Sequence, residues 1–186
     1  MPTRDYVVRS LRAALLLARF DPRGMQGFDV SLTGFWRSFG AALLVLPLSA
    51  IVQMLNFPVS AHGTAWVAFV QLGEFAVGLV AFPITMIFVA RLMGWGRQYI
   101  GYIIAYNWCG VLQSALFFPI SVAQATNALP DGPGQIIEFA VLIYVLLFET
   151  FVARTALQTT TTTAIGMVVL DYVVSVGLFL TSQRLL

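Results

Sequence analysis

Charge is scarce in this sequence, and one basic residue type is missing altogether. Charged residues make up 10% of the 186, whereas a soluble domain carries about a quarter. All ten basic residues are arginine, and lysine is absent. Hydrophobic residues make up 59% of the chain, and the mean hydropathy is +0.87. Most of the surface must therefore face a solvent other than water, and the formal charge of +2 gives no indication of nucleic-acid binding.

Cysteine and histidine are nearly missing as well. The single cysteine, Cys109, excludes an internal disulfide and a cysteine-based zinc site. The single histidine, His62, excludes the paired-histidine metal motifs, and we expect an ordinary loop residue there rather than a pH sensor. Asp171 is the only aspartate within an apolar run, so the paired aspartates of intramembrane proteolysis are missing too. We predict no enzyme activity, no catalytic residue, no metal and no cofactor.

Long apolar runs dominate what is present. A helix needs about 20 apolar residues to cross a bilayer. We predict an all-α integral membrane protein in which residues 1–30 form a cytoplasmic amphipathic helix and linker, and residues 31–186 form a five-span membrane domain. The five transmembrane helices are expected at about 32–55, 64–92, 98–120, 135–156 and 160–182. No internal repeat is visible, which argues against the inverted-repeat plan of many transporters.

Residues 3–20 have the pattern of an amphipathic helix with Thr3 at its N-cap. Arg9, Arg12 and Arg19 fall on one face at helical spacing, and the opposite face is apolar. The segment is too short to span, and a basic helix of this kind lies at an anionic membrane surface. The alternative is packing on the cytoplasmic face of its own protein, and the two placements are compatible.

The arginines also predict the orientation of the chain. With the N-terminus in the cytoplasm, nine of the ten arginines fall on the cytoplasmic side and only Arg184 lies outside. The predicted outer loops, 56–63 and 121–134, contain no arginine. Basic residues are enriched in cytoplasmic loops. We therefore predict a multi-pass protein of the bacterial cytoplasmic (inner) membrane, with its N-terminus in and its C-terminus out.

Polar side chains occur inside the predicted spans, where they are costly and point to function. At about 1.5 Å per residue, the deepest groups lie roughly 14–16 Å from a span end. These groups form a candidate mid-membrane polar site, with one further amide on the face of the second span: Glu74, Asn107, Asp171 and Gln71. Glu138 lies near the outer end of the fourth span and Glu149 near its inner end, as candidate mouths of a path.

Two interpretations of these groups remain open. In the first, the carboxyl groups carry protons or cations along a path through the membrane. In the second, they and Asn107 form hydrogen bonds between helices and hold the bundle together, with Glu149 paired to Arg37 or Arg154. The stripe Asn107, Gly110 and Ser114 is then a packing seam against the second and fifth spans, because small residues let helices approach closely.

The turn Met93-Gly-Trp-Gly-Arg-Gln98 leads into an aromatic and small-residue span that ends near Pro119. With the N-terminal helix and the five spans, it resembles bacterial members of the Yip-domain family (Ypt-interacting protein-like membrane proteins). Eukaryotic relatives are associated with vesicle trafficking and small GTPases, and carry an acidic Tyr-Gly-Pro-type segment before the first span. Here Asp21-Pro-Arg-Gly24 is no match for that segment, so GTPase binding is not implied. The resemblance implies a transporter-like or scaffolding membrane protein.

The sequence thus favours a non-enzymatic inner-membrane protein that acts by helix packing and by binding partners or lipid. Arg9, Arg12 and Arg19 are the expected membrane-surface or partner contacts. The alternative is a small oligomeric transporter or channel subunit, linked to protons or cations, that uses the mid-membrane carboxylates. The expected partners are the lipid bilayer and protein partners or further copies of the chain, and no nucleic acid.

Overall fold

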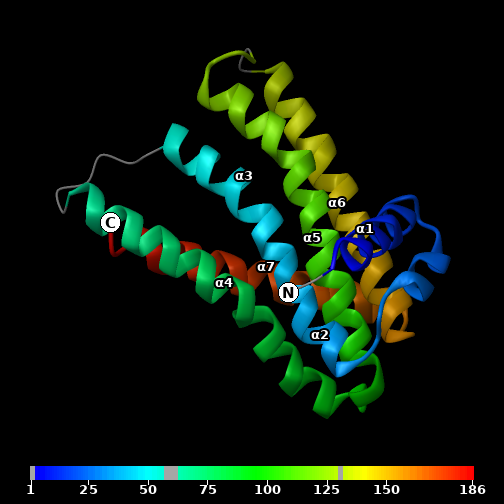
Figure 1. Ribbon diagram of the computed structural model, residues 1–186. Coiled ribbons are helices and arrows are strands. Elements are labelled where there is room, and N and C mark those ends of the chain that lie inside the picture. Colours follow the sequence, from blue (N-terminus) through cyan, green and yellow to red (C-terminus); the bar gives the residue numbers. More distant parts are fainter. Residues whose placement is uncertain (1–2, 57–62, 130–131) are drawn as a thin grey trace.

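The computed structural model describes residues 3–56, 63–129 and 132–186, and nearly all of them are helical (Figure 1). Within these ranges the structure contains no β-strand, so the all-α fold class is confirmed. His62 lies outside the described residues, as do parts of both predicted outer loops.

In the described part of the chain, five helical segments are long and apolar enough to cross a membrane. The first is Leu32–Leu55, which is made of α2 (Leu32–Ser38), a 3-10 turn η2 (Phe39–Ala41) and α3 (Ala42–Leu55). The others are α4 (Thr64–Leu92), α5 (Gly96–Ala125), α6 (Pro133–Leu157) and α7 (Thr161–Gln183). The prediction of five apolar helices of spanning length is confirmed, with limits that differ by at most a few residues.

Prolines lie inside three of these helices, at Pro47, Pro83 and Pro119. The third span was expected to end near Pro119, and the helix α5 continues from there to Ala125. A proline removes one backbone donor. In lipid, however, leaving the helix would expose further unsatisfied backbone groups, so proline is tolerated within a spanning helix.

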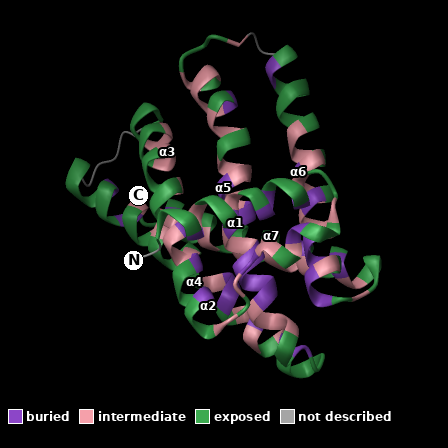
Figure 2. Ribbon diagram, turned by 45° about the vertical axis from the view of Figure 1, so that its right-hand side comes forward, coloured by how far each residue is buried: buried purple, intermediate pink, exposed green. Residues whose placement is uncertain are grey.

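The helices form two diverging arms that meet at one end. α5 and α6 run side by side in one arm, α4 and α7 form the other, and α3 lies between them against α5 (Figure 1). α5 contacts α2, α3, α4 and α6, which makes it the central helix of the bundle. Buried residues gather where the arms meet, and the far ends are largely exposed (Figure 2). α3 has no buried residue at all.

The N-terminal helix α1 (Arg4–Ala18) packs on α5 and α6 where the arms meet. Thr3 caps it, with Oγ1 accepting from the Tyr6 amide at 3.4 Å. The Tyr6 ring meets the buried Trp108 ring edge-on at 5.7 Å, and its hydroxyl donates to the carbonyl of Gly34 at 3.1 Å. Tyr144 on α6 donates to the carbonyl of Ala18 at 2.6 Å. Packing on the protein itself is therefore present, and contact with lipid stays a prediction.

Candidate polar site within the membrane domain

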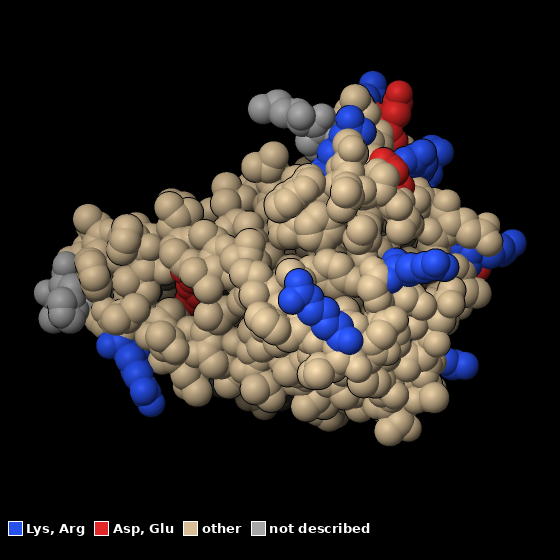
Figure 3. Space-filling view, turned by 90° about the horizontal axis from the view of Figure 1, so that it is seen from below, with Lys and Arg blue, Asp and Glu red and all other residues tan. Residues whose placement is uncertain are grey.

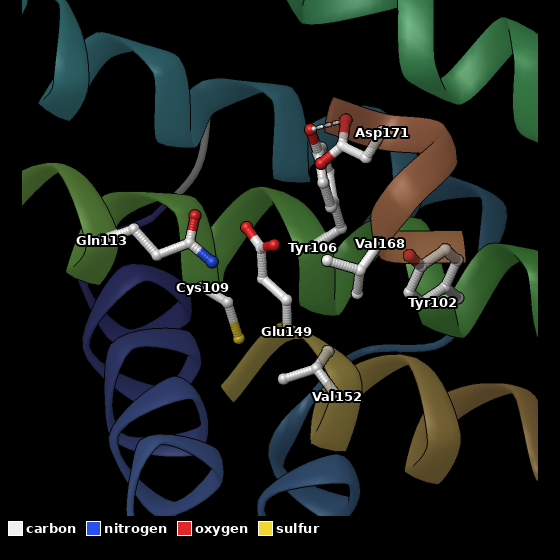
Figure 4. Close-up of a pocket in the computed structure, with 8 residues that line it drawn as sticks. All are labelled: Tyr102, Tyr106, Cys109, Gln113, Glu149, Val152, Val168 and Asp171. Carbon is white, nitrogen blue, oxygen red and sulfur yellow. Dashed lines mark hydrogen bonds between the residues drawn. The ribbon is translucent and has the colours of Figure 1, made fainter. Parts of the chain in front are cut away.

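A small cavity between α5, α6 and α7 brings Glu149 and Asp171 together (Figure 4). We call it the carboxyl-pair cavity; its volume is about 10 Å³, close to the space that one water molecule occupies. The Tyr106 hydroxyl donates to Asp171 Oδ1 at 3.0 Å. Glu149 projects from α6 between Tyr106 and Gln113 of α5, and the Gln113 amide points toward its carboxyl group. The other lining residues are Tyr102, Cys109, Val152 and Val168.

The cavity brings together Glu149 and Asp171, which the sequence interpretation placed at different depths. Glu149 was expected at the inner mouth of a path and Asp171 at its centre, yet both line the same cavity. Gln113 is a member of the site that sequence reasoning missed. Gln113 could have been identified from the sequence, because it is an amide side chain within a predicted span, as Asn107 is.

The expected ion pairs of Glu149 are not formed. Among the described residues, neither Arg37 nor Arg154 makes a salt bridge with it. The guanidinium of Arg37 instead lies over the Tyr6 ring, 6.0 Å from its centroid. Glu149 is therefore left with Asp171, Gln113 and the tyrosine side chains as its polar neighbours.

Asn107 forms its contact with the first span. Its Nδ2 donates to Ser38 Oγ at 2.8 Å, and the Ser38 hydroxyl donates to the carbonyl of Phe35 at 2.7 Å. The predicted seam against the second and fifth spans therefore differs from the structure. A Cβ added at Gly110 would meet nothing within 4 Å, so no neighbouring helix is in contact with that position. Asn107, Gly110 and Ser114 instead line a cavity of about 160 Å³, the Asn107 cavity.

Glu74 and Gln71 line a larger groove between α3, α4 and α7, of about 550 Å³. We call it the Glu74 groove. Figure 3 shows acidic atoms at the floor of a hollow in a mostly uncharged surface, far from the main group of basic side chains. Within the described residues Glu74 forms no hydrogen bond and no salt bridge. It differs in this respect from Asp171, which is bonded to Tyr106.

The three cavities adjoin one another in a series. Gly78 and Leu79 line both the Glu74 groove and the Asn107 cavity. Tyr106 and Gln113 line both the Asn107 cavity and the carboxyl-pair cavity. Glu74, Asn107 and Asp171 therefore do not share one cavity, but they line three neighbouring ones.

Glu138 lies outside this series. It is exposed, and its Oε2 accepts from Gln124 Nε2 at 2.8 Å. This bond joins the far ends of α5 and α6, so Glu138 serves a contact between helices there. The sequence places it as an outer mouth, but none of the three cavities includes it.

The exposed side of α1 carries a furrow of about 510 Å³. Its basic members define the α1 arginine surface: Arg4, Arg9, Arg12 and Arg23. Val8 and Leu16 line the same furrow and are 39% and 37% exposed. Arg19 is exposed at the end of α1, outside the furrow.

Arg23 is held in place by Asp21, just after α1. Its Nη2 lies 2.6 Å from Asp21 Oδ2, and its backbone amide donates to Asp21 Oδ1 at 2.9 Å. These hydrogen bonds and the guanidinium charge hold the pKa of the Asp21 carboxyl below its ordinary value. Asp21 therefore stays ionised and partly offsets the charge of one member of the α1 arginine surface.

Across the described residues, no group of three or more histidine, cysteine, aspartate or glutamate side chains is arranged to hold a metal ion. No family model, curated protein or solved structure matches the chain.

Proposed function

We propose that this chain is a non-enzymatic multi-pass membrane protein that binds anionic lipid headgroups at the α1 arginine surface. One observation carries the proposal. α1 packs on the bundle through Tyr6 and Leu17, while its opposite side exposes arginines beside aliphatic side chains such as Val8 and Leu16. Arginine next to exposed aliphatic surface suits the boundary between headgroups and acyl chains.

The strength of such an interaction is set by the number of basic side chains. Each arginine near an anionic leaflet contributes about 1 kcal/mol. Arg9 and Arg12 both lie on the exposed side of α1 and both line its furrow. Neutralising the pair should remove about 2 kcal/mol, which exceeds a tenfold change in affinity.

Amide hydrogen exchange of the full chain in lipid nanodiscs tests this proposal. We expect the amides of α1 to exchange about tenfold more slowly in phosphatidylglycerol discs than in phosphatidylcholine discs. In an Arg9→Gln, Arg12→Gln variant this difference should disappear. The matched control is Arg91→Gln, Arg97→Gln, which removes the same charge from exposed positions outside α1 and should keep the difference. Equal exchange of wild-type α1 in both kinds of disc would contradict the proposal.

The proposal also covers the cellular location of the chain and its relationship to a protein family. It places the chain in a bacterial inner membrane, with α1 and the N-terminus on the cytoplasmic side. It keeps the resemblance to the Yip-domain family as the expected relationship, with a scaffolding role that organises lipid or protein partners around the bundle. The nine arginines that this orientation puts on the cytoplasmic side support it.

A second function, proton-linked transport by an oligomer, is favoured by the carboxyl-pair cavity. Two carboxyl groups that line so small a cavity can exchange a proton through a single water molecule. Proteoliposomes containing a pH-sensitive dye test it. Flux should fall in a Glu149→Gln, Asp171→Asn variant and stay unchanged in Glu138→Gln. Equal flux in wild type and the double variant would rule out transport through this pair.

A further inference from the structure

Glu74, the carboxylate of the Glu74 groove, has no hydrogen-bond or salt-bridge partner in the described part of the chain. A carboxylate away from bulk water is costly unless a donor or a cation compensates it. Amide and hydroxyl groups line the groove around it, and they come from three helices: Gln53, Asn56, Gln71, Ser175 and Gln183. No described basic residue lines the groove. The electrostatic complement of this site is therefore a positive charge supplied from outside the chain.

The size and walls of the groove suit a small organic molecule. Its volume of about 550 Å³ lies within the range of roughly 300–1,000 Å³ typical of small-molecule sites. Phe75 and Phe179 contribute aromatic faces, which attract cations, and Leu79 and Leu178 add aliphatic surface. A bare metal ion would leave most of this space unfilled.

A second furrow continues the groove along α3 and α4. It has a volume of about 340 Å³ and shares Gln53, Gln71 and Phe75 with the Glu74 groove. Its remaining lining is mainly apolar and includes Leu46, Met54, Ala50, Ala68 and Leu72. A molecule whose charged end is at Glu74 therefore finds an apolar furrow for the rest of its length.

We propose that the Glu74 groove binds a lipophilic organic cation, with the charge against Glu74 and the apolar part in the furrow between α3 and α4. A zwitterionic phospholipid fits less well, because its phosphate would meet no described basic side chain among the lining residues. The site lies between the far parts of α3, α4 and α7, away from α1, so it is independent of lipid binding at the α1 arginine surface.

Binding of radiolabelled tetraphenylphosphonium to the full chain in phosphatidylcholine nanodiscs tests this site, with empty discs as the background. We expect saturable binding to wild type that the uncharged triphenylphosphine oxide does not displace. Glu74→Gln keeps the shape of the side chain and removes its charge, so affinity should fall at least tenfold. Glu138→Gln removes an exposed carboxylate outside the groove and should bind as wild type does.

Gly78→Leu provides a second variant that retains Glu74. A Cβ at Gly78 meets nothing within 4 Å, so the new side chain should enter the groove without displacing a helix, and binding should fall. Equal affinity in wild type and Glu74→Gln would overturn the proposal, as would full binding to Gly78→Leu. Loss of binding when phosphatidylethanolamine is added to the discs would also overturn it, because a lipid amine would then be the occupant.

Discussion

Two of the polar side chains at membrane depth are hydrogen-bonded to a neighbouring helix, and Glu74 differs from them. Asp171 accepts from Tyr106, and Asn107 donates to Ser38. Both bonds cross between helices, as the structural interpretation of these groups requires. Glu74 has no such bond in the described residues and faces a groove instead. In the sequence all three residues look alike, because each is a polar side chain deep within a predicted span. Only the hydrogen-bond partners seen in the structure distinguish Asp171 and Asn107 from Glu74.

The bond between Tyr106 and Asp171 is the first of these contacts to test. Tyr106→Phe removes the hydroxyl and retains the ring that packs on Phe82 with centroids 4.7 Å apart. We expect the bundle to lose about 1 kcal/mol of stability, measured by unfolding in mixed detergent micelles. Tyr172→Phe is the matched control, since Tyr172 is 61% exposed on the same helix as Asp171. An equal effect of both substitutions would show that the hydroxyl of Tyr106 contributes nothing specific.

Asp21 gives a pH-dependent prediction outside the membrane. Its native pKa is lowered by Arg23, so the stabilisation from this pair is complete above the ordinary value of 3.8 and is lost as the pH falls through the lowered native value. An NMR titration of the Asp21 carboxyl carbon should therefore give a midpoint below 3.8. Arg23→Gln should move that midpoint back toward the ordinary value. An identical midpoint in both proteins would show that the guanidinium has no influence on the carboxyl group.

Among the elements, the spanning helices were predictable and their contacts were not. Hydropathy and length predicted the limits of α4, because a membrane helix forms its backbone hydrogen bonds within itself, whatever its neighbours are. The interruption at Phe39–Ala41 was missed, since no glycine–proline turn signal marks it. The pairing of Asn107 with Ser38 and of Glu149 with Asp171 depends on how helices rotate against each other. Periodicity in one helix cannot supply that information.

Helix α1 shows the same limit on a smaller scale. The pattern of residues 3–20 predicted the helix and the exposure of its arginines, but not which of its other residues are covered. In the structure Leu15 is 48% exposed, whereas Tyr6, Ser10 and Ala13 are buried. Contact with Trp108 selects which part of the helix surface is covered, and that contact joins residues far apart in the sequence.

Tyr6 is the residue on which the docking of α1 depends. Tyr6→Ala removes the ring packed on Trp108 and the hydroxyl bonded to Gly34, and large core truncations cost about 3–5 kcal/mol. We expect α1 to undock locally, with faster amide exchange in α1 and little change in α5. Val8→Ala, at a position 39% exposed, should leave the exchange rates unchanged. Wild-type exchange in the Tyr6→Ala protein would mean that other contacts hold the helix.

For the whole molecule, the packed core lies at the end that carries α1, and the two arms diverge from it (Figure 2). Basic side chains lie mostly over that half of the molecule, and basic atoms are also visible at the opposite end (Figure 3). Charge and packing therefore coincide at the end that the proposed orientation places in the cytoplasm. The opposite end is left with the Glu74 groove and little buried surface.

Fusions to alkaline phosphatase, which is active only outside the cytoplasm, test the orientation of the molecule. A fusion after Leu186 should be active, and one within the basic turn at Gly94 should be inactive. The reason is that nine of the ten arginines lie on the side assigned to the cytoplasm, including Arg91 and Arg97 on either side of that turn. The reverse pattern of activities would require the opposite orientation and would remove α1 from the cytoplasmic leaflet.

The most direct test of the central claim measures whether α1 touches anionic lipid. Cys109 is buried and can be replaced by alanine, after which Leu16→Cys places a fluorophore on the exposed side of α1. In phosphatidylglycerol nanodiscs, lipids brominated near the headgroup should quench this fluorophore, and Arg9→Gln with Arg12→Gln should abolish the quenching. Lipid binding is contradicted if, in the protein that retains Arg9 and Arg12, aqueous iodide quenches the fluorophore and brominated lipid does not. The α1 arginine surface would then face water rather than lipid.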